Sequence, residues 1–310
     1  MSRILITGSN GFIGSYLSRY LSADGDEIVN TYRHFPDNCR KSPNHFEVGE
    51  INGSTQWIYA LKNVDVVVHL AARVHVMHET STDPLTAFRQ VNTEGTLNLA
   101  RQASESGVKR FIYLSTIKVN GEQTDKRAFT ADDNPNPLDP YAVSKYEAEQ
   151  QLLELSKQTG MEVVIIRPPL VYGPGVKGNF RRLIKLVNKS VPLPLANIKN
   201  VRSLVSIENL CSLIKICLNH PHAAGEIFLV SDGYDLSTSE LLINLAQAMG
   251  KKSFLFYIPA STIKFLTTLL GRRSEYERLF GSLQVDIRKN YQLLNWKPEQ
   301  SVQMALKNCV

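Results

Sequence analysis

The sequence predicts an α/β fold in which helices cover both faces of a doubly wound parallel sheet. Short runs of β-branched and apolar residues alternate with longer helical segments, and a glycine-rich turn follows the first of these runs. Strands that are separated by helices pair in parallel through right-handed crossovers, and this pairing builds such a sheet. With 310 residues, 43% of them hydrophobic, the chain can bury a large core without disulfides.

The expected elements follow in order from this alternation. Residues 65–70 show the signal most clearly, because three consecutive valines there predict a buried strand. We expect strands at residues 3–7, 27–32, 45–48, 65–70, 110–114, 162–166 and 226–230. Helices are expected at 12–23, 84–106 and 140–160, the last two beginning at a proline.

The regular alternation ends after Arg167. Prolines interrupt the next segment, which is typical of an excursion from the sheet: Pro168, Pro169, Pro174, Pro192 and Pro194. From Leu236 onward the chain is again helical and amphipathic. We therefore expect a main domain at 1–168, to which 201–231 returns, and a smaller, mainly helical part formed by 169–200 and 232–310.

Composition and charge argue against several classes of protein. The net charge is +6, but no run of five cations occurs, so no nucleic-acid partner is expected. An anionic small substrate and a loose association with a membrane surface explain the excess equally well. No apolar stretch reaches the roughly 20 residues that span a bilayer. The start of the chain leaves no room for a signal peptide, and no Cys-x-x-Cys pair occurs, so we expect a cytoplasmic protein.

The glycine turn follows directly on the first strand, as Gly8-Ser-Asn-Gly11-Phe-Ile-Gly14. Such a turn lets a pyrophosphate approach the backbone, and the amide groups and dipole of the next helix meet its charge. An ordinary glycine-rich turn is the alternative, but the position at the first strand–helix junction favours a dinucleotide site. The main domain is thus expected to be a Rossmann-type dinucleotide-binding domain.

The end of the second strand bears on the choice between NAD and NADP. An acidic residue at this point usually binds the ribose 2′-hydroxyl of NAD, and the strand here ends in Tyr32-Arg33 without one. Arg33 could pair with a 2′-phosphate, helped by Arg40 or Lys41, or it could be a solvated surface residue. We expect NADP(H) to be favoured, with NAD(H) possible.

A tyrosine and a lysine share one face of the helix expected at 140–160. Tyr141 and Lys145 stand four positions apart, so the ammonium is expected near the phenol, where it would lower a pKa of about 10 toward the range useful for acid–base catalysis. Ser115-Thr116 ends the strand at 110–114, where open α/β sheets bind their ligands. An ordinary amphipathic helix and a capping hydroxyl are the alternatives. The order of the three motifs favours a catalytic site.

Taken together, these motifs resemble the extended short-chain dehydrogenase/reductases that act on nucleotide sugars. The resemblance extends over most of the chain and fades in its last third. Besides the glycine turn and Tyr141-x-x-x-Lys145, the matching segments are His69-Leu-Ala-Ala72, Val91-Asn-Thr-x-Gly-Thr96, Ser115-Thr-Ile-Lys-Val-Asn-Gly121, Arg167-Pro-x-x-Val-Tyr-Gly-Pro174 and Arg202-Ser-Leu-Val-Ser-Ile-Glu-Asn-Leu210.

The resemblance implies roles for individual residues. Thr116, Tyr141 and Lys145 would be catalytic. Thr116, Lys118, Asn179 and Arg202 would bind the substrate, the last two through a nucleotide diphosphate. Together with Arg33, the residues implied in binding the cofactor are Gly8, Asn10, Gly11, Phe12, Ile13, Gly14, Glu50, Ile51, Leu70, Ala71, Ala72, Asn92, Tyr141 and Lys145. Family members often dimerise through two helices, here 84–106 and 140–159, so a homodimer is expected. His75 and His78 lack a third ligand, so no metal is expected.

Departures from the family pattern narrow the reaction. Ile117 and Lys118 replace the Asp-Glu pair of the 4,6-dehydratases, which argues against that reaction. Val119-Asn120-Gly121 departs from the Val-Tyr-Gly of UDP-galactose 4-epimerases, and Tyr32 replaces their aspartate. We therefore favour reduction of a UDP-4-keto-6-deoxy-N-acetylhexosamine in polysaccharide biosynthesis. The alternative is a UDP-glucose or UDP-N-acetylglucosamine 4-epimerase. A non-catalytic dinucleotide sensor is a further alternative, disfavoured because the chain keeps both Tyr141 and Lys145.

Overall fold

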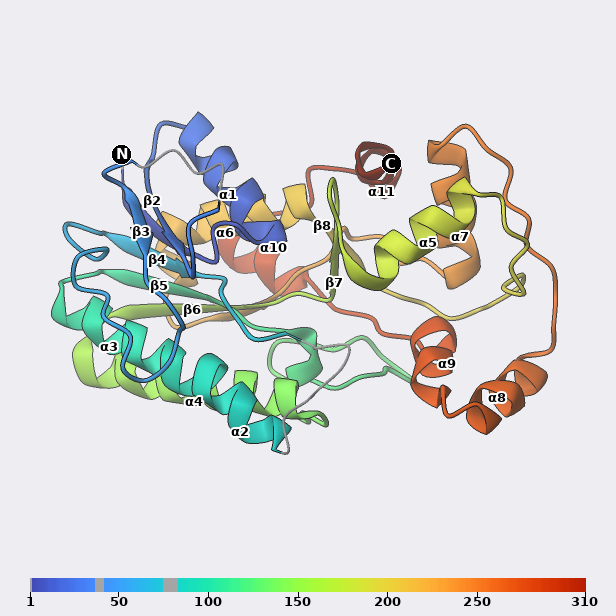
Figure 1. Ribbon diagram of the computed structural model, residues 1–310, viewed down its shortest axis with the longest axis horizontal. Helices are drawn as coiled ribbons and strands as arrows, with labels where there is room; N and C mark the ends of the chain where they lie inside the picture. The colour runs from blue at the N-terminus through green and yellow to red at the C-terminus, as the bar shows by residue number, and fades with distance from the viewer. Residues whose placement is uncertain (1, 37–41, 75–82) are drawn as a thin grey trace.

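A sheet of seven parallel strands forms the centre of the molecule (Figure 1). The computed structural model describes residues 2–36, 42–74 and 83–310. Within them the strand order is β3-β2-β1-β4-β5-β6-β9. The strands are β1 (Arg3–Thr7), β2 (Glu27–Tyr32), β3 (His45–Glu47), β4 (Val66–His69), β5 (Arg110–Leu114), β6 (Glu162–Arg167) and β9 (Ile227–Leu229). The doubly wound sheet predicted from the sequence is confirmed.

Helices cover both faces of this sheet. On one face, α1 (Phe12–Ala23) and α6 (Ile207–Asn219) pack together with α10 (Arg288–Leu294), around a core that includes Leu17, Leu213 and Trp296. On the other face, α3 (Thr96–Glu105) and α4 (Pro140–Thr159) bury a second core. Central strands such as β4 and β5 are buried on both sides, and this explains their continuous apolar runs.

The single helix expected at 84–106 is interrupted. It consists of α2 (Pro84–Arg89), a π-helical segment η1 (Gln90–Gly95) and α3. A Cβ on Gly95 would lie 2.7 Å from Ile51 Cγ2, so only glycine allows the loop of Ile51 to pack this closely. A wider π turn is frequent at functional sites, but the apolar periodicity on either side of it conceals it from sequence analysis.

A second, two-stranded sheet was not predicted. β7 (Leu170–Tyr172) pairs with β8 (Leu204–Ser206) in parallel. Strands of three residues between prolines carry too little periodicity to be recognised. Beside this sheet, α5 (Gly178–Asn188), α7 (Thr238–Ala248) and α11 (Val302–Cys309) enclose a third core.

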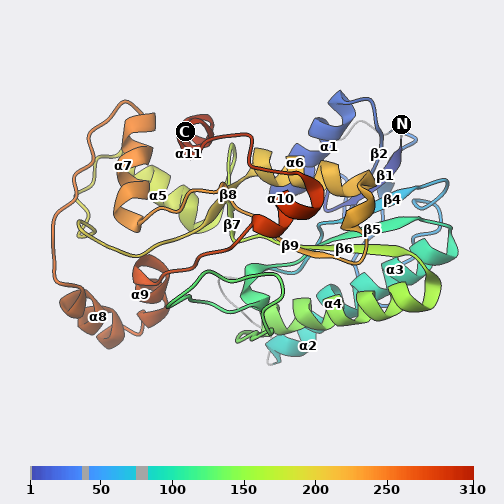
Figure 2. The same ribbon diagram turned by 180° about the vertical axis from the view of Figure 1, so that it is seen from behind.

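Two further helices lie at the end of the molecule opposite the N-terminus. These are α8 (Ala260–Leu269) and α9 (Arg273–Phe280), which are also visible from behind in Figure 2. A short helix, η3 (Pro221–Ala223), leads from α6 to β9. None of the helices in the described ranges has both the length and the apolar character that crossing a membrane requires.

Candidate active site

The glycine turn joins β1 to α1 and leaves the start of the helix open to an anion. Gly8 has a φ of +68°, which glycine adopts without strain. A Cβ on Gly14 would lie 2.2 Å from the carbonyl oxygen of Gly8, so the helix can approach the turn this closely only with glycine at that position. Gly11 is the N-cap of α1 and provides no side-chain hydrogen bond. The first amide groups of α1 therefore suit a phosphate.

The other residues of the glycine turn divide between surface and core. Asn10 is exposed, whereas Phe12 and Ile13 are partly buried and pack against the core beneath α1. Phe12 and Ile13 thus anchor the turn to the core, and its backbone stays accessible.

The end of β4 is fixed against the end of β1. The Thr7 hydroxyl accepts hydrogen bonds from the backbone amides of Leu70 and Ala71, each at 3.0 Å. His69 is fully buried between Thr7 and Thr96, at 2.7 and 3.0 Å, and burial lowers its pKa to about 3. A neutral His69 is therefore structural. The loop that carries Ala71 and Ala72 follows beside the glycine turn.

The tips of β2 and β3 bring Arg33 and Glu50 together. Arg33 Nε lies 3.5 Å from Glu50 Oε2, and both side chains are exposed. Glu47, at the end of β3, accepts a hydrogen bond from the amide of Phe35 at 3.0 Å. The tip of β2 has no acidic side chain of its own. Glu47 of β3 and Glu50 of the following loop place two carboxylates next to it. Arg40 and Lys41 lie outside the described residues.

Asn92 holds the loop after β4 against α4. Its amide oxygen accepts from the amide of Arg73 at 2.8 Å, and its amide nitrogen donates to Arg73 O and to Ser144 Oγ, each at 3.0 Å. Asn92, in the π-helical segment, thus connects the loop after β4 with helix α4. Any contact of Asn92 with a cofactor would have to share these groups.

Tyr141 and Lys145 lie in the first two turns of α4. Asp139 caps this helix, because its carboxylate accepts from the amide of Ala142 at 2.7 Å, and Pro140 occupies the first turn. The ring of Tyr141 meets Phe88 edge-on at 6.0 Å. Lys145 is 2% exposed, and its Nζ lies 4.1 Å from the centre of the Tyr113 ring.

The residues around Tyr141 do not by themselves lower its pKa as the helix spacing led us to expect. Burial raises the pKa of Tyr141, and the negative charge of Asp139 raises it further. Burial also lowers the pKa of Lys145 to about 7, although Glu149 opposes this shift. Helix spacing indicated which groups are neighbours, but it could not indicate how little water surrounds them. Tyr141 is therefore a protonated phenol at neutral pH.

Thr116 and Lys118 lie on the side of the site that faces the start of α4. Thr116 caps the short helix η2 (Ile117–Val119), and its hydroxyl accepts from the amide of Lys118 at 3.3 Å. Ser115, its neighbour, has a buried hydroxyl with no hydrogen-bond partner in the described part of the chain. Lys118 forms ion pairs with Asp139 and with Glu122, the latter at 3.1 Å. A lysine thus stands where the dehydratases carry an acid, and it pairs with the carboxylate that caps α4.

This arrangement predicts the effect of replacing Asp139. Asp139→Asn keeps a capping side chain but removes the negative charge that disfavours the phenolate, so the Tyr141 pKa falls. We expect the limb of the pH profile of kcat/KM that reports the titration of Tyr141 to move about 0.5–1 unit to lower pH. Glu122→Gln, which also removes a partner of Lys118, is the matched control and should leave the limb in place. Equal profiles for Asp139→Asn and wild type would contradict the assignment.

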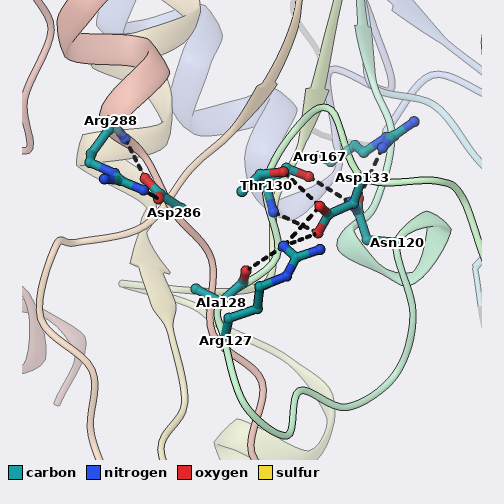
Figure 3. A network of polar contacts seen from close by, with 8 residues as sticks. All are labelled: Asn120, Arg127, Ala128, Thr130, Asp133, Arg167, Asp286 and Arg288. Carbon is teal, nitrogen blue, oxygen red and sulfur yellow. Dashed lines mark hydrogen bonds and ion pairs between the residues drawn. The ribbon is translucent and has the colours of Figure 1, made fainter.

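A network of buried polar groups supports the loop that carries Thr116 (Figure 3). Arg167, at the end of β6, is 1% exposed and pairs with the fully buried Glu149 of α4 through an Nη2–Oε2 contact of 2.5 Å. Its Nη1 also donates to Asn120 Oδ1 at 2.9 Å, and Asn120 Nδ2 donates to the carbonyl of Thr130 at 2.8 Å. Asn120, which replaces a tyrosine of the family pattern, is therefore a bridge between β6 and residues 121–133.

A cavity of about 330 Å³ adjoins this loop. It is lined by residues 120–123 and by Phe129, Asn136, Leu138 and, from α9, Glu277. The volume falls in the range of small-molecule sites, roughly 300–1,000 Å³. Sequence analysis did not indicate Glu277, because nothing near it in the chain reveals that α9 returns to the catalytic loop.

Arg202 and Asn179 lie in the part of the chain around β7, β8 and α5. The backbone of Arg202 pairs with Leu236 and Leu283, and its Nη1 donates to Gly281 O at 3.0 Å. Burial lowers the pKa of Arg202. Its only hydrogen-bond acceptor in the described part of the chain is a neutral carbonyl, so the guanidinium can still bind an anion. Asn179 is exposed in the first turn of α5.

No group of three His, Cys, Asp or Glu side chains in the described ranges could hold a metal ion. His75 and His78 lie outside these ranges. Cys211 and Cys217 are free thiols that are fully buried in α6.

Comparisons with known proteins agree with this geometry. Residues 4–231 match the NAD dependent epimerase/dehydratase family. The chain is 50% identical over 307 residues to a UDP-glucose 4-epimerase of Vibrio cholerae, which covers 98% of this chain and 93% of that protein. It is 27% identical to a GDP-6-deoxy-D-mannose reductase of Pseudomonas aeruginosa, over 98% and 95% of the two chains. The crystal structure of UDP-glucuronic acid 4-epimerase from Bacillus cereus in complex with NAD superposes with a TM-score of 0.79 at 22% identity, over 99% and 96% of the chains.

Proposed function

The chain belongs to the NAD dependent epimerase/dehydratase family, and on this premise we propose that it is a UDP-hexose 4-epimerase. The 50% identity to the Vibrio cholerae enzyme along almost the whole chain carries the proposal. The sequence alone favoured a 4-keto-sugar reductase. The similarity to a reductase is more distant, at 27%, so the epimerase is now the better supported of the two readings.

In this proposal Tyr141 exchanges a proton with the oxygen on C4 of the sugar. Thr116 hydrogen-bonds the same oxygen, so that negative charge developing there meets a donor. A bound dinucleotide supplies the redox chemistry at C4. The reaction starts from a hydroxyl on C4, so Tyr141 must first accept the O4 proton as a phenolate and then return that proton to O4 as the phenol, the form that burial favours. Lys145, next to Tyr113, would bind the ribose of the cofactor and add positive charge beside the phenol.

The smaller part of the molecule would hold the nucleotide. Arg202 is well suited to a diphosphate, because its guanidinium is largely removed from water and is paired only with a neutral carbonyl among the described residues. Asn179 would contribute from the start of α5. We propose that the segments 169–200 and 232–310 form this substrate-binding part. Helix α10 is an exception within the second segment, because it packs against the main sheet.

The proposed cofactor is NAD, although the sequence favoured NADP. A 2′-phosphate next to Arg33 would also meet the carboxylate of Glu50, and Glu47 lies at the end of the neighbouring strand. The description of the matching family names NAD. The residues that would hold the dinucleotide are the glycine turn, Glu50-Ile51, Leu70 to Ala72, Asn92, Tyr141 and Lys145.

Glu50 is therefore expected to govern discrimination between the two cofactors. Glu50→Gln should strengthen NADPH binding about three- to tenfold, because it removes the repulsion and leaves Arg33 available; since both side chains are exposed, the gain stays modest. Arg33→Ala should leave the Kd for NADH unchanged. Fluorescence titration with NADH and NADPH measures both effects. A wild-type preference for NADPH that Arg33→Ala abolishes would restore the prediction made from the sequence.

The function is tested by denaturing the purified protein and identifying any nucleotide that is released. We expect tightly bound NAD, together with interconversion of UDP-glucose and UDP-galactose without added cofactor. Protein that carries no nucleotide, takes up NADPH and consumes it with a 4-keto UDP-sugar would instead identify the reductase.

Two expectations from the sequence remain predictions. A homodimer would pair the segments 84–106 and 140–159 of two copies, since α3 and α4 lie side by side on one face of the sheet. Light scattering of the purified chain would measure its mass. The cytoplasmic location is likewise a prediction.

A further inference from the structure

Helix α8 turns an apolar face to the solvent. None of its residues is buried. Phe265, Leu269 and Leu270 are 67%, 73% and 69% exposed, and Leu266 is 48% exposed. Positions 265 and 269, and positions 266 and 270, are one turn apart, so the four side chains form a continuous surface. Exposed apolar residues that gather in this way mark an interaction surface, whereas single ones do not.

Other features add to the apolar character of this region. The hydroxyls of Thr267 and Thr268 donate to carbonyls within the helix, at 2.8 and 2.7 Å, so α8 itself satisfies these polar groups. In the segment before α8, Phe254, Phe256 and Tyr257 are 54%, 46% and 62% exposed. Because Leu255 between them pairs with Leu193, the two phenylalanines project on the opposite side.

The segment that contains α8 is positively charged. Residues 251–281 contain six cations and two acids, a net charge of +4 out of +6 for the whole chain. The cations are Lys251, Lys252, Lys264, Arg272, Arg273 and Arg278. Arg272 and Arg273 share their charge with Glu275 and Glu277, at 4.0 and 3.0 Å. An exposed apolar face bordered by cations is typical of helices that lie in the surface of an anionic bilayer.

We propose that α8 and the segment 254–257 dock this enzyme on an anionic phospholipid membrane. With ten residues, α8 is too short to span a bilayer, so it would lie in the plane of the headgroups. A second copy of the chain fits the surface less well, because two patches of +4 would repel each other. An anionic membrane covers the apolar side chains and neutralises the cations in one contact.

The docking surface is also coupled in space to the active site. Helix α8 packs against α9, and Glu277 of α9 lines the cavity beside Asn120 and Gly121. Both helices lie at the same end of the molecule (Figures 1 and 2). A docked enzyme would therefore hold this cavity near the membrane surface.

Flotation of the full-length protein with vesicles tests the proposal. We expect the protein to float with vesicles of phosphatidylethanolamine and phosphatidylglycerol, to lose this binding at high salt, and not to float with phosphatidylcholine alone. Phe265→Ser combined with Leu269→Ser should lower the bound fraction about tenfold, and Lys264→Glu should lower it severalfold. Ile58→Ser combined with Tyr59→Ser is the matched control, because those side chains are 63% and 80% exposed at a distant loop.

Activity on a soluble UDP-sugar should be unchanged in all these variants, since none of them touches the site, and this readout verifies that they fold. Wild-type protein that does not float with the anionic vesicles would overturn the proposal, as would Phe265→Ser/Leu269→Ser protein that floats like wild type. Self-association that the same double substitution abolishes, without vesicle binding, would assign the surface to a second copy instead.

Discussion

Replacing Tyr141 with phenylalanine is expected to lower kcat about 10²–10⁴-fold, the usual contribution of a positioned acid–base group. The change removes one oxygen and keeps the ring, so the edge-on contact with Phe88 should persist. Dinucleotide binding and the free energy of unfolding should stay close to those of wild type. Steady-state kinetics with UDP-glucose and UDP-galactose would measure the loss.

Tyr146→Phe provides the control for this prediction. Tyr146 also lies in α4, and its side chain is partly buried, but it follows Lys145 and lies on a different face of the helix. The same loss of a hydroxyl there should change kcat less than threefold. A Tyr141→Phe enzyme with the kcat of wild type would end the proposal that this phenol transfers the proton.

Arg167→Met is expected to destabilise the protein by about 3–5 kcal/mol, because it leaves the Glu149 carboxylate buried without its partner. The carboxylate has no access to water, and Arg167 also supplies the donor to Asn120. Urea unfolding followed by circular dichroism would measure the change. Activity should fall as well, since the loop of Thr116 loses its support from β6.

The double variant Arg167→Met/Glu149→Met separates charge from packing. A buried ion pair replaced as a whole by apolar side chains costs little, so most of the lost stability should return. If the double variant were as unstable as the sum of the two single ones, simple packing would explain the effect. A single variant within 1 kcal/mol of wild type would show that the pair contributes little.

Most strands of the main sheet could be predicted because they contain apolar runs bounded by turns, such as Val66–His69. β3 gave the weakest signal, since Phe46 is its only apolar residue. β7 and β8 could not be predicted, since three residues show no period and their pairing joins segments more than thirty residues apart. The π-helical segment was missed for a different reason. Its two ends continue the pattern of α2 and α3, and only contacts of Asn92, Thr93 and Gly95 with distant residues widen the turn.

The sequence predicted which residues belong to the candidate site, but it could not predict their pKa values or their ion-pair partners. Spacing placed Lys145 one turn after Tyr141, yet burial of both groups decides their pKa values. The partner of Lys118, Asp139, comes from a segment twenty-one residues away. Asn120 was recognised as a departure from the family pattern, but its role needed Arg167 and Thr130 to be in place. Long-range contacts of this kind leave no local trace in a sequence.

The wide turn at Gln90–Gly95 restricts how this chain can tolerate insertions and deletions. A π turn holds one residue more than an α-helical turn, so loss of one residue there would restore a regular α-helix while the flanking turns keep nearly the same phase. Leu99, Ala100 and Ala103 would stay on the sheet that they now cover. Asn92, Thr93 and Gly95 could not all keep their present contacts with Ser144 and Ile51, so a deletion here would disturb the site and leave the packing of the helix largely intact.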